Sequence, residues 1–147
     1  MITTEEIAVV VRDTLLGDAQ INSLLSDPDN QIDYERSDYA TDGIIIIPRT
    51  IQGEGSVRNG QININIHVPD LKSNTIQPNT VYRKNFPRLI ELKKAVIDAL
   101  KNHFQVEEGW NWSIGLINPP MKEKGHDEHF VSIALEITVR QKTTYNN

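Results

Sequence analysis

Hydrophobic residues first recur at helical spacing near the N-terminus of the chain. The pattern predicts a helix from Thr4 to Leu16, in which Thr3 and Glu6 can form a capping box and Gly17 provides a stop. A second, shorter helical turn is expected next, and the polar run at residues 27–30 ends it. Its core positions are Ile21, Leu24 and Leu25.

Alternation of apolar and polar residues with period two then predicts strands. Residues 44–47 are all isoleucine, and Pro48 favours a sheet edge or a bulge at that point. Residues 62–68 alternate clearly, so one face is core and the other is either wet or covered by a partner. Residues 110–116 and 131–139 predict two more strands, and residues 32–42 predict a short edge strand with a loop.

The connections complete the picture. Residues 53–60 read as a hairpin tip, with Asn59-Gly60 supplying positive φ, and residues 70–83 read as a long aperiodic loop, a feature that is often functional. A long helix is expected to begin near Pro87, with an apolar stripe that runs from Phe86 to Phe104.

This order of elements predicts an α+β domain over residues 1–140. We expect an antiparallel or mixed sheet of two hairpins, with the N-terminal helix and one long central helix packed on one face. The polar segment 141–147 is expected to be a mobile tail.

The composition of the chain excludes several classes of functional site and argues against some classes of partner. A chain of 147 residues fits one domain, and the absence of cysteine excludes disulfides, thiolate nucleophiles and cysteine zinc sites. A formal net charge of −5 argues against direct nucleic-acid binding. The N-terminus does not resemble a signal peptide, and no apolar run approaches the roughly 18 residues of a membrane span. We therefore expect that the protein does not associate with membranes. We also expect it to assemble in the cytoplasm.

Candidate chemical motifs are weak. The segment GEGSVRNG lies between strands and lacks the lysine of a phosphate-binding loop. His126 and His129 have no obvious third ligand, so a solvated loop and a metal site both remain open. Glu107-Glu108 beside the tryptophans could line a ligand cleft, although alternate tryptophans are also typical of a strand core.

Two sets of charged residues also have more than one interpretation. The acidic set could provide acid–base chemistry only if it were buried, and its neighbours indicate a solvated loop. The basic set could contact an acidic partner or be scattered. The acidic residues are Asp33, Glu35, Asp38 and Asp42; the basic residues are Arg49, Arg58, Arg83, Lys84 and Arg88. We predict no catalytic residue, no cofactor and no metal site.

The assembled pattern resembles the tail-terminator, or tail-completion, proteins of lambda-type and related long-tailed phages. The resemblance is carried by the opening helix and by three segments, as topology and pattern without a short family motif. The segments are GQININIHVPD (residues 60–70), RLIELKKAVIDAL (88–100) and HFVSIALEITVRQK (129–142). The chain departs from the family pattern in the long 70–83 loop and in the polar tip at residues 52–60.

The resemblance implies a non-enzymatic virion protein, assembled in the host cytoplasm, that forms a ring, commonly hexameric. The ring would cap the tail tube and contact the head–tail connector. The residues expected to make protein contacts are Gly53, Glu54, Arg58, Asn63, Asn65, His67, Asp70, Lys72 and Arg83. Another head–tail adaptor, or a small ligand- or metal-binding enzyme domain, remains an alternative.

Overall fold

A computed structural model describes residues 2–53, 56–73, 81–101 and 109–140. The described helices are α1 (Thr4–Leu16), α2 (Ala19–Leu24), α3 (Pro28–Gln31) and α4 (Phe86–Lys101). The described strands are β1 (Ile32–Asp33), β2 (Gly43–Pro48), β3 (Val57–Pro69), β4 (Leu71–Ser73), β5 (Val81–Arg83), β6 (Trp110–Ile117), β7 (Met121–Lys122) and β8 (Glu128–Arg140). The predicted α+β fold is confirmed.

The main sheet is mixed, with the strand order β1-β2-β3-β8-β6. Its centre is the antiparallel pair of β3 and β8, which stays in register over the whole length of both strands. β2 and β6 flank this pair in antiparallel register, β7 continues beside β8, and β1 adds a short parallel edge. Pro48 ends β2 beyond the residues that pair with β1, so it interrupts no ladder on that side.

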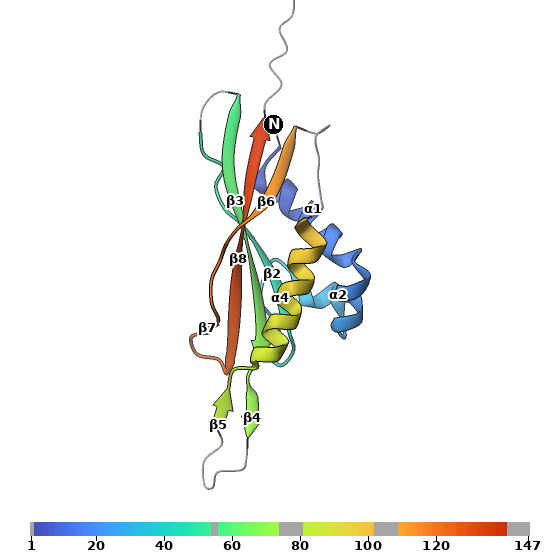
Figure 1. Ribbon diagram of the computed structural model, residues 1–147, viewed down its shortest axis with the longest axis vertical. Coiled ribbons are helices and arrows are strands. Elements are labelled where there is room, and N and C mark those ends of the chain that lie inside the picture. Colours follow the sequence, from blue (N-terminus) through green and yellow to red (C-terminus); the bar gives the residue numbers. More distant parts are fainter. Residues whose placement is uncertain (1, 54–55, 74–80, 102–108, 141–147) are drawn as a thin grey trace, which may run out of the picture.

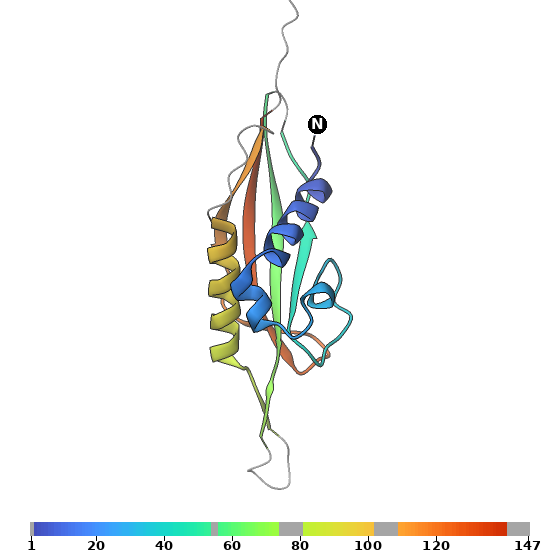
Figure 2. The same cartoon turned by 90° about the vertical axis from the view of Figure 1, so that its right-hand side faces the viewer.

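The helices cover one face of this sheet (Figures 1 and 2). Alternation in β3 turns Ile62, Ile64 and Ile66 toward the helices, where all three side chains are fully buried. The helices contribute their own apolar stripes to the same core. Those helical residues include Ile7, Val11, Leu15, Ile21, Leu89, Leu92, Val96 and Leu100. Among the described helices, none has both the length and the apolar character needed to span a membrane.

The predicted N-terminal helix agrees with α1 at both ends. The Thr3 hydroxyl accepts a hydrogen bond from the Glu6 backbone N–H at 3.2 Å, and the Thr3 N–H donates to the Glu6 carboxylate at 3.3 Å. This capping box satisfies backbone groups that the first helical turn leaves without partners.

The tryptophans belong to the core. Trp110 and Trp112 are 2% and 6% exposed, and Trp112 Nε1 donates to the Leu100 carbonyl at 2.7 Å. β6 is thereby joined to the end of α4. The interpretation of these residues as core is confirmed, whereas Glu107-Glu108 lies outside the described residues.

The predicted hairpin tip at residues 53–60 is wrong in its second half. β3 already begins at Val57, and neither Asn59 nor Gly60 has positive φ. Asn59 instead pairs with Gln52 across an isolated bridge, and the positive φ belongs to Gly53. The partner strand β8 extends to Arg140, which pairs with Val57. This pairing makes β3 begin earlier in the chain than the local turn residues Asn59 and Gly60 indicate.

The predicted loop at residues 70–83 is also wrong in part, because its two ends are the strands β4 and β5. Leu71, Lys72 and Ser73 pair with Arg83, Tyr82 and Val81. Strands of three residues are too short to reveal a period in the sequence. We call these two strands the β4–β5 arm.

Two smaller differences concern the ends of predicted elements. Phe86, at the start of the expected stripe of α4, is 46% exposed and does not join the core. The expected end of the stripe at Phe104 and the tail at residues 141–147 lie outside the described residues.

Replacement of Ile64 with alanine tests the central β3–β8 pair. Because this fully buried side chain leaves a cavity, we expect Ile64→Ala to lower the free energy of unfolding by about 2–5 kcal/mol in urea titrations. Val57→Ala on the same strand, where the side chain is 49% exposed, is the control and should change it by no more than about 0.5 kcal/mol. Equal losses in both variants would contradict this assignment of the core.

Candidate functional site

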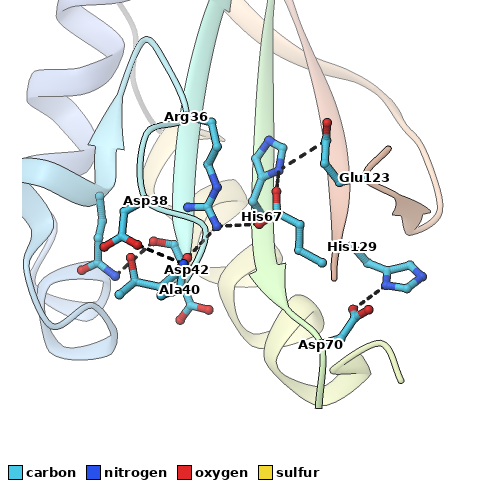
Figure 3. Close-up of polar contacts among 11 residues, drawn as sticks. Arg36, Asp38, Ala40, Asp42, His67, Asp70, Glu123 and His129 are labelled. Atoms are coloured by element: carbon cyan, nitrogen blue, oxygen red, sulfur yellow. Dashed lines mark hydrogen bonds and ion pairs between the residues drawn. The ribbon is translucent and has the colours of Figure 1, made fainter. Parts of the chain in front are cut away.

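A buried polar cluster occupies the sheet face opposite the helices, which we call the outer face. Arg36, from the segment after β1, extends toward His67 on β3 (Figure 3). Arg36 Nη2 lies 2.6 Å from Glu128 Oε2, and His67 Nδ1 lies 3.0 Å from Glu128 Oε1. The Glu128 side chain is 1% exposed, so both of its oxygens depend on these protein partners.

The strand register explains why these residues meet. His67 lies opposite Phe130 in β8 and opposite Gly43 in β2. Glu128 precedes Phe130 by two residues and therefore lies diagonally from His67 on the same face. Gly43 leaves the space above it free, and a Cβ there would lie 2.3 Å from Arg36 Nη1. The absence of a side chain at Gly43 thus allows the guanidinium to approach the sheet this closely.

Further contacts hold Arg36 and His67 in position. Arg36 Nη2 also donates to the Thr41 carbonyl at 2.6 Å, which closes the segment between β1 and β2 around the guanidinium. The Phe130 ring stacks on the His67 imidazole with centroids 5.1 Å apart. Both partners of the buried Glu128 carboxylate are therefore held by further contacts of their own.

The protonation of His67 follows from its burial. Desolvation is the largest influence and lowers the pKa of His67 below 6.5; Glu128 opposes this change, and the positive charge of Arg36 adds to it. His67 is then neutral at pH 7, and the contact with Glu128 is a hydrogen bond in which Nδ1–H donates to the carboxylate.

A second carboxylate approaches the same ring nitrogen. Glu123 Oε2, from the segment after β7, lies 3.8 Å from His67 Nδ1 (Figure 3). Within the described part of the chain, His67, Glu123 and Glu128 form the one group of histidine and carboxylate side chains whose ligand atoms lie close enough to hold a metal ion. The cluster combines one nitrogen and two carboxylate donors.

The described residues that were predicted to make protein contacts extend from the segment before β3, along β3, to the β4–β5 arm. Gly53 and Arg58 line a groove of about 1050 Å³ beside the N-terminus of α1, and Glu54 lies outside the described residues. Asn63 and Asn65 lie on the outer face, half-buried.

At the other end of β3, the candidates differ in accessibility. His67 is 5% exposed and belongs to the buried cluster. The Asp70 carboxylate is also buried and contacts His129 Nδ1 at 2.6 Å and Lys122 Nζ at 3.1 Å. Lys72 and Arg83, on the β4–β5 arm, are exposed. Of the predicted contact residues at this end that the structure describes, Lys72 and Arg83 are the two with exposed side chains.

The histidines singled out from the sequence have other roles. His129 contacts Asp70, whereas the His126 ring stacks on Tyr39 with centroids 3.6 Å apart. Neither belongs to the cluster of His67 with the two glutamates.

The acidic and basic sets are divided among separate contacts. Asp42 Oδ2 accepts from Arg88 Nε at 2.9 Å, and Arg88 also bonds Glu91 and the Leu24 carbonyl. Asp38 accepts from the Ala40 N–H at 2.9 Å, within its own segment. Asp42 and Asp38 therefore bond to different partners and do not form an acid–base pair with each other. The Arg88 guanidinium is occupied by hydrogen bonds within the chain.

Sequence reasoning missed Arg36, Glu123 and the role of Glu128. Arg36 and Glu128 are separated by 92 positions, and His67 and Glu128 by 61. No local period links residues at such distances, so only the register of β2, β3 and β8 brings them together.

The sequence matches none of the protein-family models and none of the curated proteins with which it was compared.

The burial of His67 predicts a dependence of stability on pH. Its pKa is lower in the folded chain than the 6.5 of an exposed histidine, so the unfolded chain binds the proton first as the pH falls. We expect the free energy of unfolding, measured in EDTA, to decrease as the pH falls below 6.5 toward the folded pKa. His67→Asn retains a donor for Glu128 and should show a weaker decrease.

His126→Asn is the matched control for this measurement and should retain the wild-type pH dependence. The facing charges, Glu128, Arg36 and Glu123, are present in both variants. An unchanged pH dependence in His67→Asn would contradict the assignment.

Proposed function

We propose that this chain is a non-enzymatic structural protein of a phage or prophage tail, which forms a ring that caps the tail tube and joins it to the head connector. The order of helices and strands is compatible with the tail-terminator resemblance described above. The observation that carries the proposal is the β4–β5 arm, which projects beyond the end of the main sheet and of α4 (Figure 1).

The arm has exposed apolar side chains on both faces. In its antiparallel register, Leu71 shares one face with Arg83, and Tyr82 shares the other with Lys72. Leu71 and Tyr82 are each 44% exposed. A two-stranded hairpin is marginally stable on its own, so burial of both faces against a neighbour would stabilise it. Such an arm suits insertion into a neighbour rather than contact along one side.

Charge favours another copy of the chain as that neighbour. Residues 71–84 contain three basic residues and no acidic one, whereas the whole chain has 20 acidic and 15 basic residues. A basic arm is therefore attached to an acidic body, and the arm of one copy complements the body of the next.

A contact of this type is one that can build a ring. An arm that binds a different surface on the neighbouring copy makes a heterologous interface, which closes into a ring when the rotation between copies permits. The tail-terminator resemblance suggests six copies, with the tail tube protein and the head–tail connector as partners. In this proposal the ring assembles in the host cytoplasm and remains in the virion tail.

The mass of the protein in solution tests the arm contact. We expect the wild type to form a ring-sized species by light scattering, with rings visible in negative-stain images. Leu71→Ser/Tyr82→Ser should shift it to the monomer while the circular dichroism spectrum stays unchanged, because both side chains are exposed.

Leu116→Ser is the matched control, since Leu116 is 68% exposed on β6, away from the arm. This variant should retain the ring-sized species. A wild type that stays monomeric at high concentration and also in the presence of purified tail tubes would overturn the proposed function. Rings that persist in the arm variant would show that another surface makes the contact.

A further inference from the structure

We propose that His67, Glu123 and Glu128 form a binding site for a divalent transition-metal ion, for which zinc is the best fit. The inference does not depend on the proposed tail function. It rests on the placement of one buried imidazole nitrogen against two carboxylates from different parts of the chain.

The donor atoms have the spacing of a small coordination site. His67 Nδ1 lies 3.0 Å from Glu128 Oε1 and 3.8 Å from Glu123 Oε2, and all three ligand atoms lie within 4.8 Å of one another. Tetrahedral zinc with bonds of about 2.0–2.2 Å holds its ligand atoms about 3.3–3.6 Å apart. The two separations from His67 Nδ1 bracket this range, and the two carboxylates lie within the 4.8 Å limit, so movement of the Glu123 carboxylate toward the other two ligands would complete the geometry.

Without an ion, the hydrogen-bonding capacity of the imidazole does not satisfy both acids. His67 Nδ1 carries at most one hydrogen, and Glu128 Oε1 is the nearer acceptor. Glu123 is left close to a second carboxylate, where like charges repel. A divalent cation among the three atoms attracts both acids. The neutral imidazole binds it through Nδ1 once its hydrogen is on Nε2.

Neighbouring side chains orient two of the three ligands, Glu128 and His67. Arg36 binds the other oxygen of Glu128, at 2.6 Å, and so fixes the direction of Oε1. The Phe130 ring stacks on His67. Outer contacts of this kind orient metal ligands and affect metal affinity.

The third ligand provides access to the site. The Glu123 backbone N–H donates to the Glu128 carbonyl at 3.0 Å, which places Glu123 beside the start of β8. Its side chain is 29% exposed, so an ion can enter from this side and retain water as a further ligand. One imidazole with two carboxylates is a donor set that suits zinc better than calcium or magnesium, which prefer oxygen alone.

Calorimetric titration of untagged, EDTA-stripped full-length protein with zinc chloride tests the site. We expect one zinc ion per chain and a higher melting temperature with zinc than without it. Glu123→Gln removes one charged ligand from a partly exposed position and should weaken zinc binding at least about tenfold. Glu136→Gln is the matched control, because Glu136 is an exposed carboxylate on β8 outside the cluster.

His67→Asn provides an independent variant that keeps an amide donor for Glu128 and loses the imidazole. It should also lose zinc binding, while His126→Asn should retain it. The absence of zinc binding by the wild type would overturn the proposal and leave the cluster as a hydrogen-bonded network. Wild-type zinc affinity in both Glu123→Gln and His67→Asn would overturn it too, as would equally tight binding of calcium or magnesium.

Discussion

The antiparallel pairing of β3 with β8 is the interaction on which the rest of the structure depends. The two strands remain in register from Val57 opposite Arg140 to Pro69 opposite Glu128. Both alternate with period two, so one register places the apolar residues of both strands on the same side, under α1 and α4. A shift by one residue would turn these side chains to the outer face and expose the core.

The same register determines which side chains meet at the end of the pair where Pro69 lies opposite Glu128. It places Glu128 beside His67 and buries the acid, and a buried charge requires partners from elsewhere in the chain. Arg36 supplies one partner because Gly43 leaves room for it. Removal of a single partner would leave a charge without compensation, so the segment after β1 and the start of β8 are held as one unit.

This unit lies at the base of the β4–β5 arm. Asp70, between β3 and β4, is fixed by His129 and Lys122, and its backbone N–H donates to the Asp127 carbonyl at 2.9 Å. The proposed arm contact and the proposed metal site therefore occupy adjacent but different parts of the chain. The arm has exposed apolar and basic side chains suited to a partner, whereas the cluster has buried polar groups suited to a small ion. Because its base is anchored by these contacts, the arm would lose less conformational entropy on binding a partner than an unanchored loop would.

The sequence by itself determined the elements whose signals are local: α1 with its capping box, the alternating strands and the α+β class. Their periods and caps depend on residues only a few positions apart, so the sequence alone reveals them. Only the tertiary structure decided that β3 begins at Val57, that a two-stranded arm replaces the expected loop, and that His67 meets Glu128. Those outcomes depend on strand register and on burial between segments far apart in the chain, and no local pattern encodes either.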